Sequence, residues 1–283
     1  PSPPTAAAPS SECFEVVFLS RVATVATADR PQHARSLYPR EYVPVGAQIS
    51  TDTTTFAVLR GPQGTLVLLG VQTSLGLHHL NNPIRLALHT GTVEIIQRPL
   101  GPPSTPSTAH TIEMTTPTEV TLHSTEQAHL VLSHHNDRTH IIAHSGTTTV
   151  QMAPDTPSQP LQPHHAICIG DGDPCDAQPR PLPTAPTIIS GSAPLDSQLS
   201  WKPVPQAQGY LVLLSFDPRQ LHRVRAIQVD DPWLDIDAPM RRQGLWWSVH
   251  ALDAVGHPGP PSPVFRLPTR TPSTREPDVS MLQ

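Results

Sequence analysis

Short apolar runs separated by glycines fill residues 45–93, and they constrain the fold more than any other feature of this sequence. The runs 56–59 and 66–69 have the length of β-strands and consist mainly of aliphatic residues. Glycine permits the backbone conformations that tight turns need. The glycines that lie between such runs or at their ends are Gly46, Gly61, Gly64, Gly70 and Gly91. This pattern predicts a small all-β domain.

The composition extends the β prediction to the rest of the chain. The 36 prolines and 15 glycines among 283 residues leave little room for long helices. Lys202 is the only lysine and the net charge is −5, so the basic density that binding to nucleic acid requires is missing. No apolar run reaches the roughly 18 residues of a transmembrane helix. A low content of charged residues with many Thr, Ser and Pro favours a periplasmic or extracellular location, after removal of a signal peptide.

Three cysteines divide into a pair and a single residue. Cys168 and Cys175 flank a loop that contains two glycines and a proline, so a local disulfide is geometrically easy. We expect this disulfide if the compartment is oxidising. Cys13 is the odd cysteine and is predicted as a buried thiol on the first strand.

The pattern of strands and prolines divides the chain into two β domains. We expect a disordered N-terminal segment (1–12), a first β domain (13–152), a proline-rich linker that carries the cysteine loop (153–184), a second β domain (185–268) and a flexible tail (269–283). Within the first domain, Asn136-Asp137 and Ser145-Gly146 are predicted as hairpin turns.

The first domain resembles the FecR domain of bacterial envelope proteins over residues 14–152. The resemblance rests on the ordered motifs VGAQIST (45–51), FAVL (56–59), GTLVLL (64–69) and LALHTGTV (86–93). One departure is Gly61-Pro62-Gln63-Gly64, where the family more often has a single Asp-Gly turn. The resemblance implies a β domain in the cell envelope, and it includes signalling ectodomains among the functions to consider.

The second domain resembles a fibronectin type III-like β-sandwich. The motifs are LSW (199–201), GYLV (209–212) and WWSVHALD (246–253). The alternation within them predicts inward positions shared by two facing sheets. These positions are Trp201, Tyr210, Trp247, Val249 and Ala251. Asp253 precedes a glycine-containing turn, in which its carboxylate is expected to accept backbone N–H bonds.

A loop rich in soft ligands is the strongest candidate for a metal site. Its candidate ligands are His164, His165, Cys168, Asp171, Asp173 and Cys175. Thiolate and imidazole suit zinc or copper. The cysteine spacing matches no common zinc motif, however, and a disulfide would remove both thiolates. We therefore favour a stapled surface loop without metal or cofactor, and keep the metal site as the alternative.

The other polar residues carry weaker signals. His140 and His144 would share a face of a strand about 13 Å apart, which is too far for one ion. We expect such histidines to face solvent. Asp231 and Asp235 flank Trp233 and could form a catalytic dyad only across a cleft. No motif of a phosphate loop or of a catalytic serine is present, so we do not expect an enzyme.

The sequence is thus interpreted as a non-enzymatic envelope protein that binds other envelope or surface proteins, as a subunit or scaffold of a larger assembly. Sheet edges would supply the contacts. One alternative is a protein that binds peptidoglycan or carbohydrate, with Trp233 and Trp246 as the candidate stacking surface. The other alternative is a FecR-like signalling ectodomain.

Overall fold

The computed structural model describes residues 13–27, 30–61, 64–80, 82–97, 111–170, 175, 177–190, 198–237 and 243–267. Within these ranges the chain is built from β-strands, which confirms the predicted all-β class. The described residues include no helix with the length and apolar character needed to cross a membrane. The predicted N-terminal segment and tail, together with Asp171 and Asp173, lie outside the described residues.

Fifteen strands form one large sheet, which we call the first module. They are β1 (Cys13–Leu19), β2 (Ala23–Thr27), β3 (Arg30–Leu37), β4 (Tyr42–Pro44), β5 (Ala47–Ser50), β6 (Ala57–Arg60), β7 (Leu66–Leu69), β8 (Ser74–His79), β9 (Ile84–Ile96), β10 (Thr111–Thr115), β11 (Thr121–His135), β12 (Arg138–Gln151), β13 (Gln159–Leu161), β14 (His165–Ile169) and β15 (Arg180–Pro181). The strands surround one hydrophobic core that runs from Phe14 in β1 to Ile167 in β14.

Strand β9 is the branch point of the first module, because it pairs with β7, β8, β10 and β11. The apolar runs 84–88 and 92–97, on either side of Gly91, predict two strands here. The structure instead has one strand of thirteen residues. Gly91 has φ +93°, and a side chain at this position would meet the backbone of Thr73. Position 91 therefore requires glycine because the backbone of Thr73 lies too close for a side chain, and not because the chain reverses direction there.

The two predicted turns in the β11–β12 region have different outcomes. Asn136 and Asp137 join β11 to β12 with positive φ values of 50° and 60°, so this hairpin turn is confirmed. The predicted turn at Ser145-Gly146 is wrong, because both residues lie inside β12. Between the pairs His129–Ser145 and Leu130–Ala143, β12 has one extra residue, His144. The glycine belongs to an irregular stretch of this strand, where a bulge shifts the register.

The segment 153–184 is not a linker throughout. β13 and β14 both pair with β12 and extend the first module. Pro160 lies in the short strand β13 at the edge of the sheet, where a residue without an N–H group is tolerated. The Cys168–Cys175 disulfide is present, as predicted. Cys13 begins β1 and is half-buried rather than buried.

Eight further strands form two sheets around a second core, and we call them the second module. The three-stranded sheet contains β16 (Ile188–Ser190), β17 (Gln198–Trp201) and β20 (Trp233–Asp235), and the five-stranded sheet contains β18 (Gly209–Ser215), β19 (Arg223–Val229), β21 (Trp246–Leu252), β22 (Pro258–Pro261) and β23 (Phe265–Arg266). All five predicted inward residues are buried in the shared core. Asp253 accepts the N–H groups of Val255 and His257, as expected.

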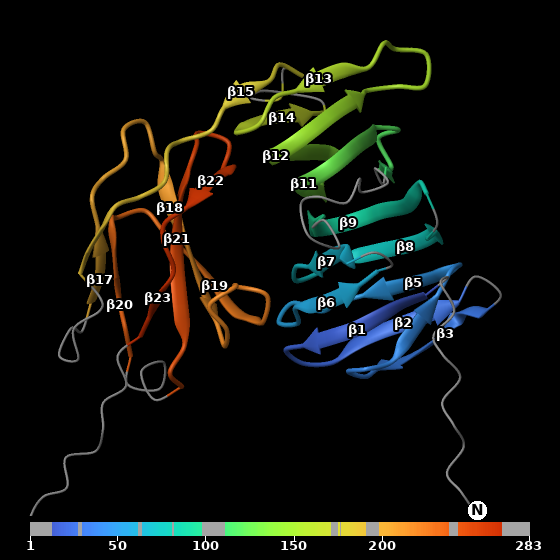
Figure 1. Cartoon of the computed structure of the whole chain (residues 1–283), viewed down its shortest axis with the longest axis horizontal. Helices are drawn as coiled ribbons and strands as arrows, with labels where there is room; N and C mark the ends of the chain where they lie inside the picture. Colours follow the sequence, from blue (N-terminus) through green and yellow to red (C-terminus); the bar gives the residue numbers. More distant parts are fainter. Residues whose placement is uncertain are drawn as a thin grey trace, which may run out of the picture.

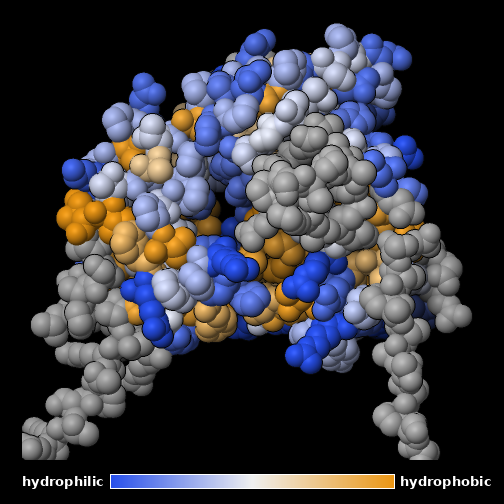
Figure 2. Space-filling view, viewed as in Figure 1, coloured by the Kyte–Doolittle hydropathy of each residue, from blue (hydrophilic) through white to orange (hydrophobic). Residues whose placement is uncertain are grey.

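The two modules lie beside each other and are joined by the chain that follows β15 (Figure 1). The five-stranded sheet of the second module faces the first module across a hollow, where apolar side chains are visible (Figure 2). Phe18 of β1 stacks on His222, which precedes β19, with ring centroids 4.7 Å apart. Leu221 packs against Val58 and Leu68 of the first module. The modules are therefore in direct contact.

Candidate functional site

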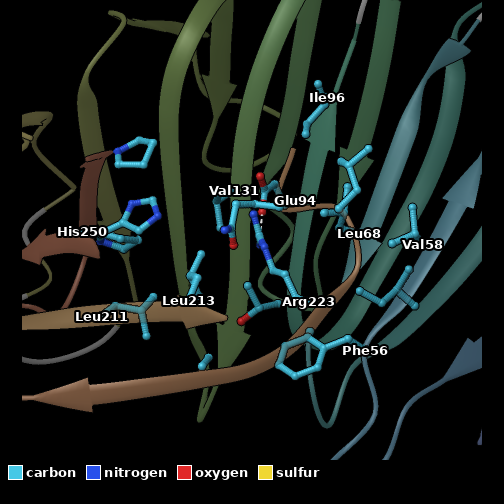
Figure 3. Close-up of a pocket in the computed structure, with 18 of the residues that line it drawn as sticks. Phe56, Val58, Leu68, Glu94, Ile96, Val131, Leu211, Leu213, Arg223 and His250 are labelled. Carbon is cyan, nitrogen blue, oxygen red and sulfur yellow. Dashed lines mark hydrogen bonds and ion pairs between the residues drawn. The ribbon is translucent and has the colours of Figure 1, made fainter. Parts of the chain in front are cut away.

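A cavity of about 560 Å³ lies between the modules. Its size is in the range of small-ligand sites in proteins. Strands β6, β7, β9 and β11 form one wall, and β18 with the residues around β19 forms the other (Figure 3). The apolar residues of the walls include Phe56, Val58, Leu68, Ile96, Val131, Leu211 and Leu213.

Strand alternation explains why apolar residues line both walls. In β18, Val212 and Leu214 point into the core of the second module, so Leu211 and Leu213 point to the opposite side, into the cavity. In β7, Val67 belongs to the core of the first module, whereas Leu68 lines the cavity. These strands are apolar on both faces because the other module covers the outer face.

A buried ion pair joins the two modules at the cavity. Glu94 in β9 accepts a charged hydrogen bond from Arg223 in β19 (Figure 3). The same carboxylate accepts a hydrogen bond from Nε2 of His129 in β11, at 2.8 Å. Burial alone would raise the pKa of Glu94, but Arg223 and His129 outweigh it and hold the pKa well below its ordinary value. Glu94 is therefore ionised and neutralised within the site.

Two buried histidines lie beside this ion pair. The bulge in β12 places His144 with its ring 4.7 Å from that of His129. Burial, with the nearby His129 and His250, lowers the pKa of His144 to about 3. Burial also lowers the pKa of His250 to about 4, and its Nδ1–H donates to the carbonyl of Gly259 at 2.7 Å. Both imidazoles are consequently neutral near pH 7.

The walls of the cavity have unused hydrogen-bonding capacity. Among the residues that the structure describes, Nδ1 of His144 and Oγ of Ser248 are buried and have no hydrogen-bond partner. Both residues line the cavity. Buried polar atoms in native proteins are normally paired, so each such atom needs an explanation. Polar groups of a ligand in the cavity would give these atoms hydrogen-bond partners.

A second polar cluster lies where β12 and β14 meet the second module. Nε2 of His140 lies 3.8 Å from Sγ of Cys168 in the disulfide. Nδ1 of His140 is 2.6 Å from Nε2 of His257, and Nδ1 of His257 is 3.0 Å from Oδ2 of Asp253. A chain of polar contacts thus runs from the disulfide of the first module to a carboxylate of the second.

The candidate metal ligands of the sequence are only partly brought together. Cys168 and Cys175 are joined, and the histidine beside them is His140. His164 is exposed, and Nδ1 of His165 donates to the carbonyl of Pro163 at 3.0 Å. The expectation that such histidines face solvent is wrong for His144, which is buried, and for His140, which is half-buried.

The other candidate residues lie at the surface of the second module. Trp233 is 39% exposed in β20, and Trp246 is half-buried with the guanidinium of Arg266 6.0 Å from its ring centre. Asp231 and Asp235 are exposed around β20. Trp247 occupies the core, as expected for one member of the Trp246–Trp247 pair.

The sequence interpretation did not identify the residues that join the modules. Glu94 and Arg223 are 129 positions apart, and His140 and His257 are 117 apart. No local motif connects such residues. The available signal is a charged residue inside an apolar strand, Glu94 in TVEII, because an unpaired carboxylate is rarely buried.

Comparison with known proteins does not assign a family. No protein-family model matches the chain, and no curated protein matches it. A crystal structure described as that of an anti-sigma factor from Parabacteroides distasonis is similar over 47% of this chain, with 14% identity and a TM-score of 0.38. The match spans 59% of that chain. The FN1–FN3 domains of chicken CNTN1 align with 91% of this chain and 98% of their own, at 12% identity and a TM-score of 0.25. Scores this low leave the function to be argued from the site itself.

Proposed function

We propose that this chain is a non-enzymatic binding protein of the bacterial cell envelope, periplasmic or extracellular, that binds another envelope protein at the junction of its two modules. The observation that carries the proposal is the ligand-sized apolar cavity at that junction, whose lining residues include His144 and Ser248 with unpaired buried polar atoms. An apolar side chain or short segment of a partner, with a polar group next to it, fits this combination. The resemblance to FecR and fibronectin type III-like domains agrees with such a role.

The state of the polar groups supports binding rather than catalysis. Glu94 is neutralised by Arg223, and the low pKa values of His144 and His250 keep both rings neutral. A general acid or base works best with a pKa near the operating pH. The disulfide supports a location outside the cytoplasm, since disulfides persist in oxidising compartments.

Filling the cavity tests the proposal. Leu213 points into the cavity and away from the core of its own module, so L213W should occupy the space without disturbing that core. Tagged full-length protein would be purified from the native envelope, and associated proteins identified by mass spectrometry. We expect a stoichiometric partner with the wild type and its loss with L213W.

The matched control introduces the same residue elsewhere. Ile189 in β16 is 62% exposed, and I189W should keep the partner. Retention of the partner by both variants would contradict binding in the cavity. Recovery of the wild type on purified cell wall, with no protein partner, would instead favour the peptidoglycan alternative and the exposed Trp233.

The same cavity favours a second candidate, a signalling ectodomain that binds a small molecule between its modules. The unpaired atoms of His144 and Ser248 are the specific observation, because the polar groups of a small compound would give them hydrogen-bond partners. Native mass spectrometry of the protein purified from its own envelope distinguishes the two candidates. A bound compound of low mass supports the ectodomain, whereas a protein partner supports the leading proposal.

A further inference from the structure

We propose that, after reduction of the Cys168–Cys175 disulfide, the two sulfur atoms and Nε2 of His140 bind one soft metal cation of the Zn²⁺ class. None of these three residues is among the described residues that line the cavity. The inference therefore goes beyond the proposed function and does not depend on it. It differs from the alternative metal site considered from the sequence, in which the histidines were His164 and His165.

The sheet brings these ligands together from distant parts of the chain. β12 pairs with β14 so that His140 lies directly opposite Cys168. The disulfide adds Cys175, whose Cα is 4.8 Å from that of Cys168. One ligand atom from each of the three residues lies within 4.8 Å of the other two. A metal site can thus form from this cluster without rearrangement of the strands.

The distances fit tetrahedral zinc. With Zn–S near 2.3 Å and Zn–N near 2.0 Å, a sulfur and a nitrogen on one ion lie about 3.6 Å apart. The observed separation of Sγ of Cys168 and Nε2 of His140 is 3.8 Å. Two thiolates on one ion lie about 3.8 Å apart, compared with about 2.05 Å for bonded sulfurs. Rotation of the two cysteine side chains can supply this difference.

The second module supplies the outer contacts that a metal-binding histidine needs. The carboxylate of Asp253 only accepts, so Nδ1 of His257 donates to it. In the neutral ring, Nε2 of His257 then accepts from Nδ1–H of His140. This tautomer leaves a lone pair on Nε2 of His140, directed toward the sulfur of Cys168. Histidine ligands of metals commonly have such a partner on their second nitrogen.

The cluster is also partly shielded from solvent, with Cys175 half-buried. Cys168 is 4% exposed and His257 is 4% exposed, while His140 is half-buried between the modules. A set of two sulfur atoms and one imidazole favours a thiophilic cation over Mg²⁺ or Ca²⁺, which prefer oxygen ligands. Three protein ligands leave a fourth tetrahedral position for water.

The disulfide is converted to two thiols by thiol–disulfide exchange. A dithiol reductant donates two electrons and two protons, the Cys168–Cys175 bond breaks to give two thiols, and the reductant becomes a disulfide. The cation then binds the two sulfurs as thiolates and releases their two protons. The oxidised chain has no thiolate to offer here, so metal binding depends on the redox state.

Metal titration of the full chain tests this site. The protein would be reduced with dithiothreitol, freed from it under argon, and titrated with Co²⁺ and then Zn²⁺. We expect a thiolate-to-cobalt charge-transfer band that saturates at one Co²⁺ per chain and disappears on addition of Zn²⁺. X-ray absorption of the zinc form should show two sulfur neighbours and at least one nitrogen or oxygen neighbour. Oxidised protein should show no such band. A reduced chain without the band, or a zinc shell without sulfur, would overturn the proposal.

Variants test the role of His140. H140Q should weaken Zn²⁺ binding by at least about tenfold, and H257Q, which removes the outer contact, by about 10- to 100-fold. H165Q is the matched control, because it changes a histidine in the neighbouring strand β14, and it should leave the affinity unchanged. Circular dichroism checks that each variant is folded. If H140Q fails to fold, H257Q decides the question. The assignment of His140 is wrong if H140Q folds and binds Zn²⁺ with wild-type affinity. If H140Q does not fold, wild-type affinity of H257Q leads to the same conclusion.

Discussion

Replacing Arg223 by methionine should destabilise the docked arrangement of the two modules. The Glu94 and Arg223 side chains are only 9% and 20% exposed, so R223M leaves a carboxylate buried without its main counter-charge. Removing one partner of a buried ion pair costs about 3 to 5 kcal/mol. His129 still donates to Glu94 in the variant. We therefore expect the lower end of that range, about 3 kcal/mol.

Urea denaturation followed by tryptophan fluorescence measures this loss. All four tryptophans lie in the second module, at positions 201, 233, 246 and 247, so their fluorescence reports on the unfolding of that module. Docking to the first module stabilises the folded second module, and its loss should lower the free energy of unfolding. Small-angle scattering should show an increased radius of gyration as the modules separate.

Two control variants make the result specific. Arg225 is exposed on the same strand, and R225M should change the stability by less than about 0.5 kcal/mol. The double variant E94Q/R223M removes both charges and should recover most of the loss, because an uncharged pair carries no unpaired buried charge. The reasoning would be refuted if R223M had the stability of the wild type, or if the double variant were no more stable than R223M.

Two further predictions concern pH and a glycine. The pKa values of His144 and His250 in the folded protein are about 3 and 4, whereas histidine in an unfolded chain has a pKa near 6.5. Below about pH 6.5 the unfolded chain therefore binds more protons than the folded protein. The free energy of unfolding consequently falls as the pH decreases. For His144 the loss between pH 7 and pH 5 is about 2 kcal/mol, and urea titrations of H144Q should show a pH dependence smaller by that amount; an unchanged pH dependence would contradict the prediction. Glu94 acts in a lower range, because its lowered pKa contributes stability that is present above about pH 4.3 and lost below it. G91A should reduce the free energy of unfolding by at least about 2 kcal/mol, because the new side chain would meet the backbone of Thr73. G46A is the control: Gly46 has φ +81° and open space around it, so the substitution should cost only about 1 kcal/mol. Equal losses for the two variants in thermal unfolding would contradict the steric argument.

The sequence predicts well what depends on neighbouring residues. Alternation in WWSVHALD correctly identifies the inward residues of the second module, and Asn136-Asp137 correctly predicts a two-residue turn. Ser145-Gly146 shows the limit of this reasoning. A glycine with positive φ serves a turn and an irregularity inside a strand equally well, so local sequence does not distinguish them.

Long-range contacts could not be predicted from one sequence. β13 and β14 lie in a proline-rich stretch whose composition is typical of a linker, and only their pairing with β12 makes them strands. The histidines of β12 look solvent-facing because the strand pattern gives no indication that another module covers that face. The cavity and the contact of His140 with His257 both result from this packing of one module on the other.

Photo-crosslinking in the native envelope tests the central claim most directly. A photoreactive phenylalanine analogue would replace His135, which is exposed and lines the cavity, and in a second protein would replace Ile189, which lies elsewhere on the surface. Binding of a partner at the junction predicts that position 135 crosslinks to one envelope protein and that position 189 does not. A crosslink at position 189 with none at position 135 would contradict the account.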